Sequence, residues 1–216
     1  MKLSPFAAFL CLLVPAAAAD LDMSRMLKDI EAHYNSAKTL EVGFQETLVQ
    51  QGRRRVESGI LFLRKPGRMR WQYTAPAGKL LVSDGKTLYF FSPDSNRAEK
   101  MKLKETEDMR APMAFLLGRL EFEKDFQAFS SKLDMKTGRT SITATPKSDK
   151  MPYREVTFLV AEGSRIDRLV VVGQDATVLE FDFSSEKVNP KLADSLFQFK
   201  LPPGAEYIDN SGDSKP

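Results

Sequence analysis

The chain has 216 residues, of which 42% are hydrophobic and 28% charged, with 32 basic and 29 acidic residues and a net charge of +3. This hydrophobic content argues against a disordered chain. The near-balance of charges argues against a nucleic-acid partner, which would need a strongly basic surface. The length fits one sizeable domain.

The first nineteen residues have the pattern of a cleaved secretion signal. Lys2 gives a positive start, residues 6–14 form an apolar segment, and the alanines at 17–19 offer a cleavage site before Asp20. The apolar segment is too short to span a bilayer. We therefore expect residues 1–19 to be removed and the mature protein to be secreted, with the periplasm as its location.

Cys11 is the only cysteine of the chain, and it lies inside this apolar segment. A bacterial lipoprotein has its cysteine at the cleavage site after a small residue, whereas Cys11 follows Phe9 and Leu10. The mature chain is therefore expected to lack a lipid anchor, a disulfide and a thiol nucleophile. We expect residues 20–209 to form a single domain, residues 210–216 to be a flexible tail, and the protein to be a monomer.

The first predicted element is an amphipathic helix at residues 21–38. Apolar side chains recur there every three or four residues, which is typical of a helix with one buried face. They are Met23, Met26, Leu27, Ile30 and Tyr34. From Leu40 to Phe44 the apolar residues alternate instead, which predicts a strand.

Further strands follow, separated by turns that contain glycine or proline. The turns at residues 65–67, 75–78 and 84–85 are too short for parallel crossovers, so neighbouring strands are expected to be antiparallel. Residues 108–120 interrupt the pattern with helical spacing. Strands are predicted at residues 55–64, 68–74, 80–83, 87–92, 131–135, 140–145, 153–160, 166–172 and 178–184, with a short last one at 197–200.

One antiparallel sheet of about ten strands, with helices before it and midway, accommodates these elements. An open sheet of this size tends to curl. We therefore predict a mainly β protein with helices (α+β), in which a curled sheet forms a cup and helices form its lid.

Catalytic motifs are missing from the chain. His33 is the only histidine, and no nucleophile elbow, zinc-protease motif, phosphate loop or dinucleotide fingerprint is present. We expect no enzyme activity, no cofactor and no metal site. An enzyme that acts on lipids through a pair of acidic residues is the competing class.

The strands instead offer apolar faces. Met69, Trp71 and Tyr73 alternate with polar residues and so share one face of their strand. Leu61 and Leu63 do the same on the preceding strand, where Lys65 has the same parity, and Phe90 lies in a run that is apolar on both faces. Periodicity does not distinguish an ordinary core from a ligand cavity.

The stretch SGILFLRKPGRMRWQY at residues 58–73, followed by Pro76 and by LVSDGKTL at residues 81–88, resembles the outer-membrane lipoprotein carrier family, LolA. Further matching segments follow in the expected order, at residues 40–45, 111–117, 145–147, 197–199 and 202–204. The resemblance runs from the first helix nearly to the end of the chain.

This resemblance implies an incomplete antiparallel β-barrel (a half-barrel) with a helical lid over an apolar cavity. It implies a periplasmic carrier that accepts triacylated lipoproteins from an ABC transporter of the inner membrane and delivers them to the receptor LolB on the outer membrane. Met69 and Trp71 match cavity positions, and residues 112–117 match a lid helix. The expected ligand-binding residues are Leu61, Leu63, Met69, Trp71, Tyr73, Phe90, Met113, Leu116 and Leu117.

One position departs from the family. Members typically have arginine immediately before the proline, where it bonds the lid backbone, but this chain has Lys65. We expect Lys65 to act as the lid latch, with the compact ammonium of lysine in place of the planar guanidinium of arginine. Alternation points Arg64 to the opposite face. Three alternatives stay open: a carrier of another lipid or glycolipid, a sensor on the same fold, and a LolB-like receptor.

Overall fold

The computed structural model describes residues 16–103 and 120–211. In these two ranges the chain forms one sheet, a long helix and three short helical segments. The helical elements are α1 (Ala16–Ser36), α3 (Phe122–Asp125), η2 (Glu162–Ser164) and η3 (Asp194–Phe197). The strands are β1 (Thr39–Gln50), β2 (Arg53–Arg64), β3 (Arg68–Ala75), β4 (Ala77–Asp84), β5 (Thr87–Ser92), β6 (Arg97–Lys102), β7 (Phe126–Asp134), β8 (Arg139–Pro146), β9 (Tyr153–Val160), β10 (Ile166–Gly173), β11 (Val178–Val188) and β12 (Glu206–Asp209).

The strand order divides the sheet into two consecutive meanders. It runs β12-β6-β5-β4-β3-β2-β1-β11-β10-β9-β8-β7, so β1–β6 form one half and β7–β11 the other. The halves meet where β1 pairs antiparallel with β11, which places Phe44 opposite Phe183 and Leu48 opposite Leu179. Every other neighbouring pair among the described strands is antiparallel as well, except β6 and β12.

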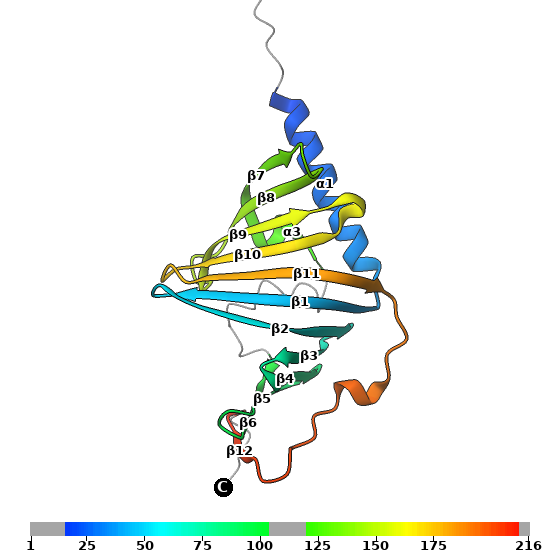
Figure 1. Ribbon diagram of the computed structural model, residues 1–216. Helices are drawn as coiled ribbons and strands as arrows, with labels where there is room; N and C mark the ends of the chain where they lie inside the picture. The colour runs from blue at the N-terminus through cyan, green and yellow to red at the C-terminus, as the bar shows by residue number, and fades with distance from the viewer. Residues whose placement is uncertain (1–15, 104–119, 212–216) are drawn as a thin grey trace, which may run out of the picture.

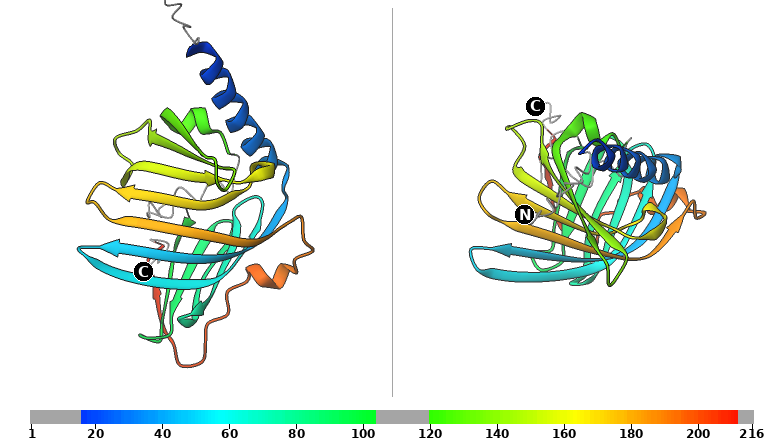
Figure 2. Two further views of the ribbon diagram at one scale, coloured as in Figure 1. Left: turned by 45° about the horizontal axis from the view of Figure 1, so that its top comes forward. Right: turned by 90° about the horizontal axis from the view of Figure 1, so that it is seen from above.

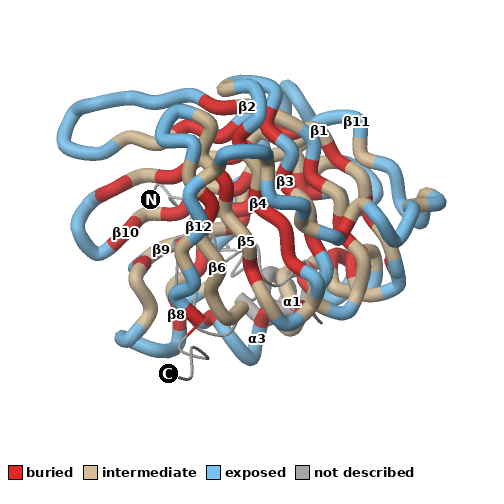
Figure 3. The backbone as a smooth tube through the Cα atoms, turned by 90° about the horizontal axis from the view of Figure 1, so that it is seen from below, coloured by how far each residue is buried: buried red, intermediate tan, exposed pale blue. Residues whose placement is uncertain are grey.

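The sheet is strongly curved, and its two edges do not meet. Figure 1 shows β7 and β12 at opposite ends of the fold, and Figure 2 shows the strands between them bending around one concave side. Buried positions run along the middle of the strands, whereas exposed positions gather at the hairpin ends (Figure 3). This confirms the predicted fold class, an incomplete antiparallel barrel with few helices.

Helix α1 confirms the predicted amphipathic helix, although it ends at Ser36. Its core-facing side chains are those that the helical spacing indicates: Leu27, Ile30 and Tyr34, with Met23 and Met26 partly buried. The hydroxyl oxygen of Tyr34 accepts a hydrogen bond of 2.9 Å from the backbone N–H of Ile166, the first residue of β10. The helix is thereby tied to the second half of the sheet.

Strands β2 and β3 approach each other closely at Gly59. A β-carbon there would lie 2.2 Å from the carbonyl oxygen of Gln72 and 2.8 Å from the α-carbon of Tyr73. Backbone atoms cannot rotate away, so a larger residue would force the strands apart. The register shifts between Ser58 and Gly59, which marks an irregularity in the ladder at this point.

The chain after β11 crosses the convex side of the sheet before it reaches β12 (orange to red in Figure 1). We call residues 189–205 the C-terminal strap. Phe197 in this strap is only 2% exposed, and η3 packs against β3 and β4. Val82 and Ala98, which alternation places on the convex side, have no exposed surface. The strap therefore covers a second, smaller core on the back of the sheet.

Arg64 fastens the strap to the sheet. Its guanidinium lies 5.1 Å from the centroid of the Phe197 ring, and it donates hydrogen bonds to the Asp194 carboxylate and the Leu192 carbonyl oxygen. A second arginine, Arg70, donates to the carbonyl oxygen of Leu196. The side of the strand that carries Arg64 is thus the convex one, as alternation predicts.

Two predictions about the strands were wrong. Residues 197–200 are not a strand, because Phe197 ends η3 and residues 198–200 pair with no strand of the sheet. The last described strand is instead β12, which joins the sheet in parallel. The prediction of about ten strands, all antiparallel, is corrected to twelve strands within the described ranges, one of them parallel to its neighbour. The predicted helix at residues 108–120 lies outside the described residues, apart from the buried Leu120.

The sequence of β12 is too short and polar to predict a strand. Backbone and side-chain contacts with β6 hold it in the sheet. The Glu206 N–H donates to the Asn96 carbonyl oxygen at 2.9 Å, and the Asn210 N–H donates to that of Lys100 at 2.8 Å. The Lys100 ammonium lies 2.8 Å from the Asp209 carboxylate. Hydrogen bonds from Lys100 and then from Ser211 lower the pKa of Asp209 to about 2.

The Phe197→Ala substitution is expected to lower the free energy of unfolding by about 3–5 kcal/mol, because it empties the buried position under the strap. Phe199→Ala is the matched control, since Phe199 is only half-buried and stacks on Tyr89. Urea denaturation of both variants measures the difference. Equal losses in the two variants would show that Phe197 is not the anchor of the strap.

Candidate functional site on the concave face

An uninterrupted row of apolar side chains crosses four neighbouring strands on the concave side. The register pairs Leu61 with Trp71, Trp71 with Leu81, and Leu81 with Phe90. Val42 extends the row onto β1, opposite Leu61. Leu61 has no exposed surface and Trp71 is 3% exposed. Alternation within each strand, combined with the register between strands, therefore gathers these residues into one surface.

A second row lies beside the first, on the side nearer to the end of α1. It runs from Leu40 through Leu63, Met69 and Ser83 to Leu88. Ser83 is its one polar member, and its hydroxyl oxygen accepts a hydrogen bond of 3.1 Å from the backbone N–H of the following turn. The row is thus apolar toward the concave side, and the Ser83 hydroxyl, its one polar group, has a hydrogen-bond partner.

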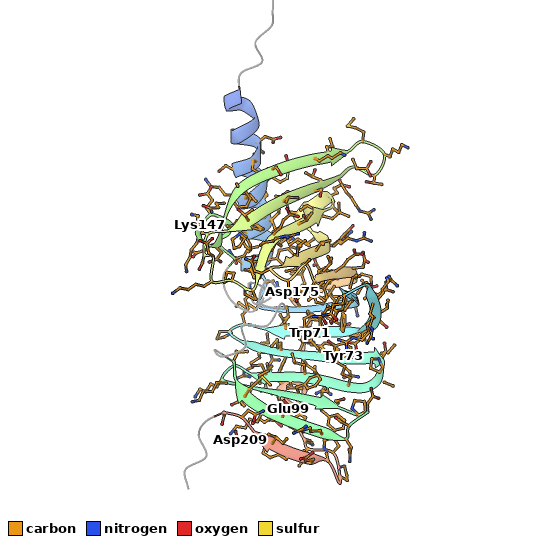
Figure 4. The ribbon with its side chains drawn as sticks, turned by 90° about the vertical axis from the view of Figure 1, so that its left-hand side faces the viewer. Trp71, Tyr73, Glu99, Lys147, Asp175 and Asp209 are labelled. Carbon is orange, nitrogen blue, oxygen red and sulfur yellow. The ribbon has the colours of Figure 1, made fainter. Side chains whose placement is uncertain are left out.

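Aromatic rings join the two halves of the sheet at this surface. The Phe44 ring packs edge-on against Trp71 and Tyr73, with centroid distances of 4.8 Å and 5.1 Å. Trp71 also lies 5.7 Å from the ring of Phe181 on β11. Figure 4 shows Trp71 and Tyr73 in the middle of the sheet. The aromatic cluster stabilises the seam between the meanders and widens the apolar surface across it.

The structure brings together those predicted ligand-binding residues that it describes. They belong to a single apolar cluster, in which Phe90 is partly buried: Leu61, Leu63, Met69, Trp71, Tyr73 and Phe90. The other three, Met113, Leu116 and Leu117, lie outside the described residues, as does the predicted lid helix. A role in ligand binding therefore stays a prediction for all nine.

Lys65 bonds the end of helix α1. Its ammonium donates a hydrogen bond of 2.6 Å to the carbonyl oxygen of Tyr34, in the last turn of that helix. A cation is favourable there because the last carbonyl groups of a helix carry partial negative charge. Burial lowers the pKa of Lys65 below its ordinary value. The partner of Lys65 in the described structure is thus α1, and its contact with a lid stays a prediction.

The same end of α1 is held by Glu186 near the end of β11. One carboxylate oxygen lies 2.9 Å from Nε2 of His33, and the other accepts a hydrogen bond of 3.1 Å from the Tyr34 hydroxyl. Burial, and then the charge of Glu186, raise the pKa of Tyr34 far above its ordinary value of 10.0. Tyr34 therefore stays a neutral donor, and His33 and Tyr34 share Glu186 as their partner.

The sequence analysis missed a set of buried charged residues on the same concave side. Glu46 and Glu57 lie opposite each other on β1 and β2, and Lys79 on β4 forms an ion pair with Glu57. Their parity was the available signal, because Glu46 follows Phe44 by two residues and Lys79 precedes Leu81 by two. This polar set borders the apolar rows at the end away from α1.

A separate groove of about 1050 Å³ lies between α1 and the turns at residues 137–140 and 160–167. Asp167 in this groove accepts hydrogen bonds of 2.8 Å from Arg139 and Arg165. Its lining mixes a few apolar residues, such as Met26 and Val160, with glycine, hydroxyl and charged residues, so it lacks the continuous apolar surface of the concave rows.

The described residues hold neither a membrane-spanning helix nor a metal centre. None of the helices within residues 16–103 and 120–211 is long and apolar enough to cross a membrane. The same ranges contain no group of three or more His, Cys, Asp or Glu side chains placed to hold a metal ion.

Comparison with known proteins identifies the family. Residues 35–200 match the family model described as outer membrane lipoprotein carrier protein LolA. The chain belongs to the LolA family. This is a family of transport and binding proteins that do not catalyse reactions. The match spans the strands from β1 through β11 and so includes both apolar rows on β1–β5.

Curated relatives agree with this assignment. The outer-membrane lipoprotein carrier protein of Chromobacterium violaceum is 25% identical over 202 residues, covering 93% of this chain and 94% of the relative. That of Nitrosospira multiformis is 28% identical over 183 residues, covering 83% and 86%. An uncharacterised conserved protein from Thermus thermophilus shares the fold, with a TM-score of 0.55, 9% identity, and coverage of 88% of this chain and 99% of that one.

The Lys65→Met substitution is expected to speed amide hydrogen exchange in the last turn of α1 about tenfold, because it removes a charged hydrogen bond to the Tyr34 carbonyl oxygen. Lys65→Arg restores a donor and should restore slow exchange. Lys38→Met, at an exposed neighbouring position, is the control and should change nothing. Unaltered exchange in Lys65→Met would show that Lys65 does not hold the helix.

Ionisation of Tyr34 should limit stability in alkali. A phenol whose pKa is raised on folding contributes stability that is complete below its unfolded pKa, near 10, and is lost as the pH rises above that value. The Tyr34→Phe variant should be less stable at neutral pH but should lose less stability between about pH 10 and pH 12. Urea midpoints across this pH range test it. If the urea midpoint of the variant falls with pH as steeply as that of the wild type, the alkaline loss belongs to other tyrosines. Tyr153 is one of these, because burial raises its pKa to about 12.

Proposed function

We propose that this chain carries lipoproteins across the periplasm and holds their acyl chains against the apolar rows of the concave face. The observation that carries the proposal is the uninterrupted row formed by Val42, Leu61, Trp71, Leu81 and Phe90 across β1–β5. Membership of the LolA family and the names of the curated relatives support a lipoprotein as cargo.

The energetics explain why such a cargo needs a carrier. At roughly 0.8 kcal/mol per methylene, moving one sixteen-carbon chain from a membrane into water costs about 12 kcal/mol. An apolar surface removes most of that cost. Met69 in the second row adds a flexible side chain that adapts to irregular ligands. Adaptable binding also lets the cargo leave, which a carrier requires.

The proposal extends to the steps before and after transport. Residues 1–19 act as the cleaved signal that brings the chain to the periplasm, and residues 20–209 then form the carrier. An ABC transporter of the inner membrane loads a triacylated lipoprotein, and an outer-membrane receptor such as LolB accepts it. The lid segment that the family resemblance implies, residues 112–117, lies outside the described residues. Lys65 is proposed as its latch through helix α1, to which it is hydrogen-bonded.

The chain's single tryptophan allows a direct test. Trp71 lies in the apolar row, so a triacylated lipopeptide with brominated acyl chains should quench its fluorescence in a saturable, one-to-one titration. A matched variant, Trp71→Phe with Phe199→Trp, moves the indole to the convex side, where Phe199 stacks on Tyr89. That variant should bind the lipopeptide without quenching.

Equal quenching in both proteins, or none in either, would contradict binding on the concave face. Quenching of the wild type by a brominated free lipid or glycolipid, but not by the lipopeptide, would replace the cargo with another amphiphile. Native mass spectrometry of the mature protein with an intact lipoprotein gives the stoichiometry independently.

A further inference from the structure

A charged network is buried next to the apolar rows. The Lys79 ammonium forms an ion pair with the Glu57 carboxylate and lies 4.3 Å from the ring centroid of Tyr73 and 5.8 Å from that of Phe90. The Tyr73 hydroxyl donates a hydrogen bond of 3.1 Å to Oε2 of Glu46. The network therefore shares Tyr73 and Phe90 with the surface proposed to bind acyl chains.

Its position along the strands is defined by the register. Glu46 lies opposite Glu57, one pleat beyond the pair of Phe44 and Gly59. In both strands the next inward residues toward α1 are apolar, namely Phe44 on β1 and, past Gly59, Leu61 on β2. The concave face is thus amphipathic along its length, apolar near α1 and charged toward the β1–β2 turn.

The charges in this network do not balance among its buried members. Glu46 is 3% exposed, Glu57 6% and Lys79 7%, so two carboxylates are buried with one ammonium. Arg55 lies 3.4 Å from Glu57 but is largely exposed, so its charge is screened by water. Among the described residues, Glu46 receives one hydrogen bond, from the neutral Tyr73 hydroxyl. Within residues 16–103 and 120–211, the Glu46 carboxylate therefore has no buried cation of its own.

Folding stability does not account for this arrangement. Removing charged groups from water is unfavourable, and apolar residues of similar size at such positions often leave a protein as stable or more so. A lipid cargo supplies a reason, because its polar end must find hydrogen-bond partners once the acyl chains are enclosed.

We infer that this network holds the polar end of the cargo and that Glu46 accepts a hydrogen bond from an N–H group beside the acyl chains. The inference rests on the proposed function, and it specifies that the polar end of the cargo is recognised as well as its acyl chains. Two sources share this chemistry: the amide of an N-acylated terminus and the ammonium of a free one. The Lys79–Glu57 pair holds the Tyr73 ring beside Glu46.

The test is the Glu46→Gln variant of the mature chain, titrated through Trp71 fluorescence. The probes are a triacylated lipopeptide with an amide, a diacylated lipopeptide with an ammonium, and palmitic acid, which has no N–H group. Loss of a charge-assisted hydrogen bond should weaken lipopeptide binding about tenfold, most for the ammonium. Palmitic acid should bind equally or better, because the variant removes a negative charge near its carboxylate.

Glu41→Gln is the matched control. Glu41 lies on the same strand, but its carboxylate pairs at 2.6 Å with the exposed Lys187, so all three probes should bind as they do to the wild type. A fall confined to the diacylated probe assigns Glu46 to a free ammonium, and a fall for both lipopeptides assigns it to either N–H source.

Two results would overturn the inference: an equal loss for all three probes, which indicates a structural role, or no loss for either lipopeptide. Failure of the wild type to bind any lipopeptide would instead remove the proposed function. Tyr73→Phe gives a second reading, because it keeps the ring against Lys79 and frees the Glu46 oxygen for a ligand. Lipopeptide affinity should then hold or rise, and a fall would also count against the inference.

Discussion

The pairing of β1 with β11 is the constraint on which the rest of this structure depends. It is the one strand pairing between the two meanders among the described strands, and it brings Phe44 opposite Phe183 across more than half of the sequence. Contacts this distant cost loop-closure entropy, so they need strong packing in return. The aromatic cluster of Phe44, Trp71 and Phe181 supplies it at the seam. With the seam formed, the sheet curves and one side becomes concave.

The curvature gives the two sides of the sheet different tasks. The convex side of β3–β6 is covered by the C-terminal strap, which buries Phe197 and is fastened by Arg64. The concave side carries the apolar rows and, beyond them, the buried network of Glu46, Glu57 and Lys79. A strap that occupies the back leaves the front for a ligand. An amphipathic front suits a cargo that is itself part lipid and part polar chain.

Much of the candidate site was predictable because its apolar residues recur at the regular spacing of a strand or a helix. Met69, Trp71 and Tyr73 alternate within one strand, and the spacing of Leu27, Ile30 and Tyr34 marks the buried face of α1. The charged network was not found, although Glu46 and Lys79 have the parity of inward residues. A single charged residue in a strand gives no indication of its partner, and these partners come from three separate strands.

The sequence by itself determined the alternation of the strands, the amphipathic helix and the turns that make neighbouring strands antiparallel, because each depends on residues close in the chain. The tertiary structure alone decided that β11 joins β1, that β12 adds in parallel beside β6, and that residues 197–200 are not a strand. Strand pairing over long separations depends on which apolar faces can be buried together. That is a property of the whole fold, and no local pattern encodes it.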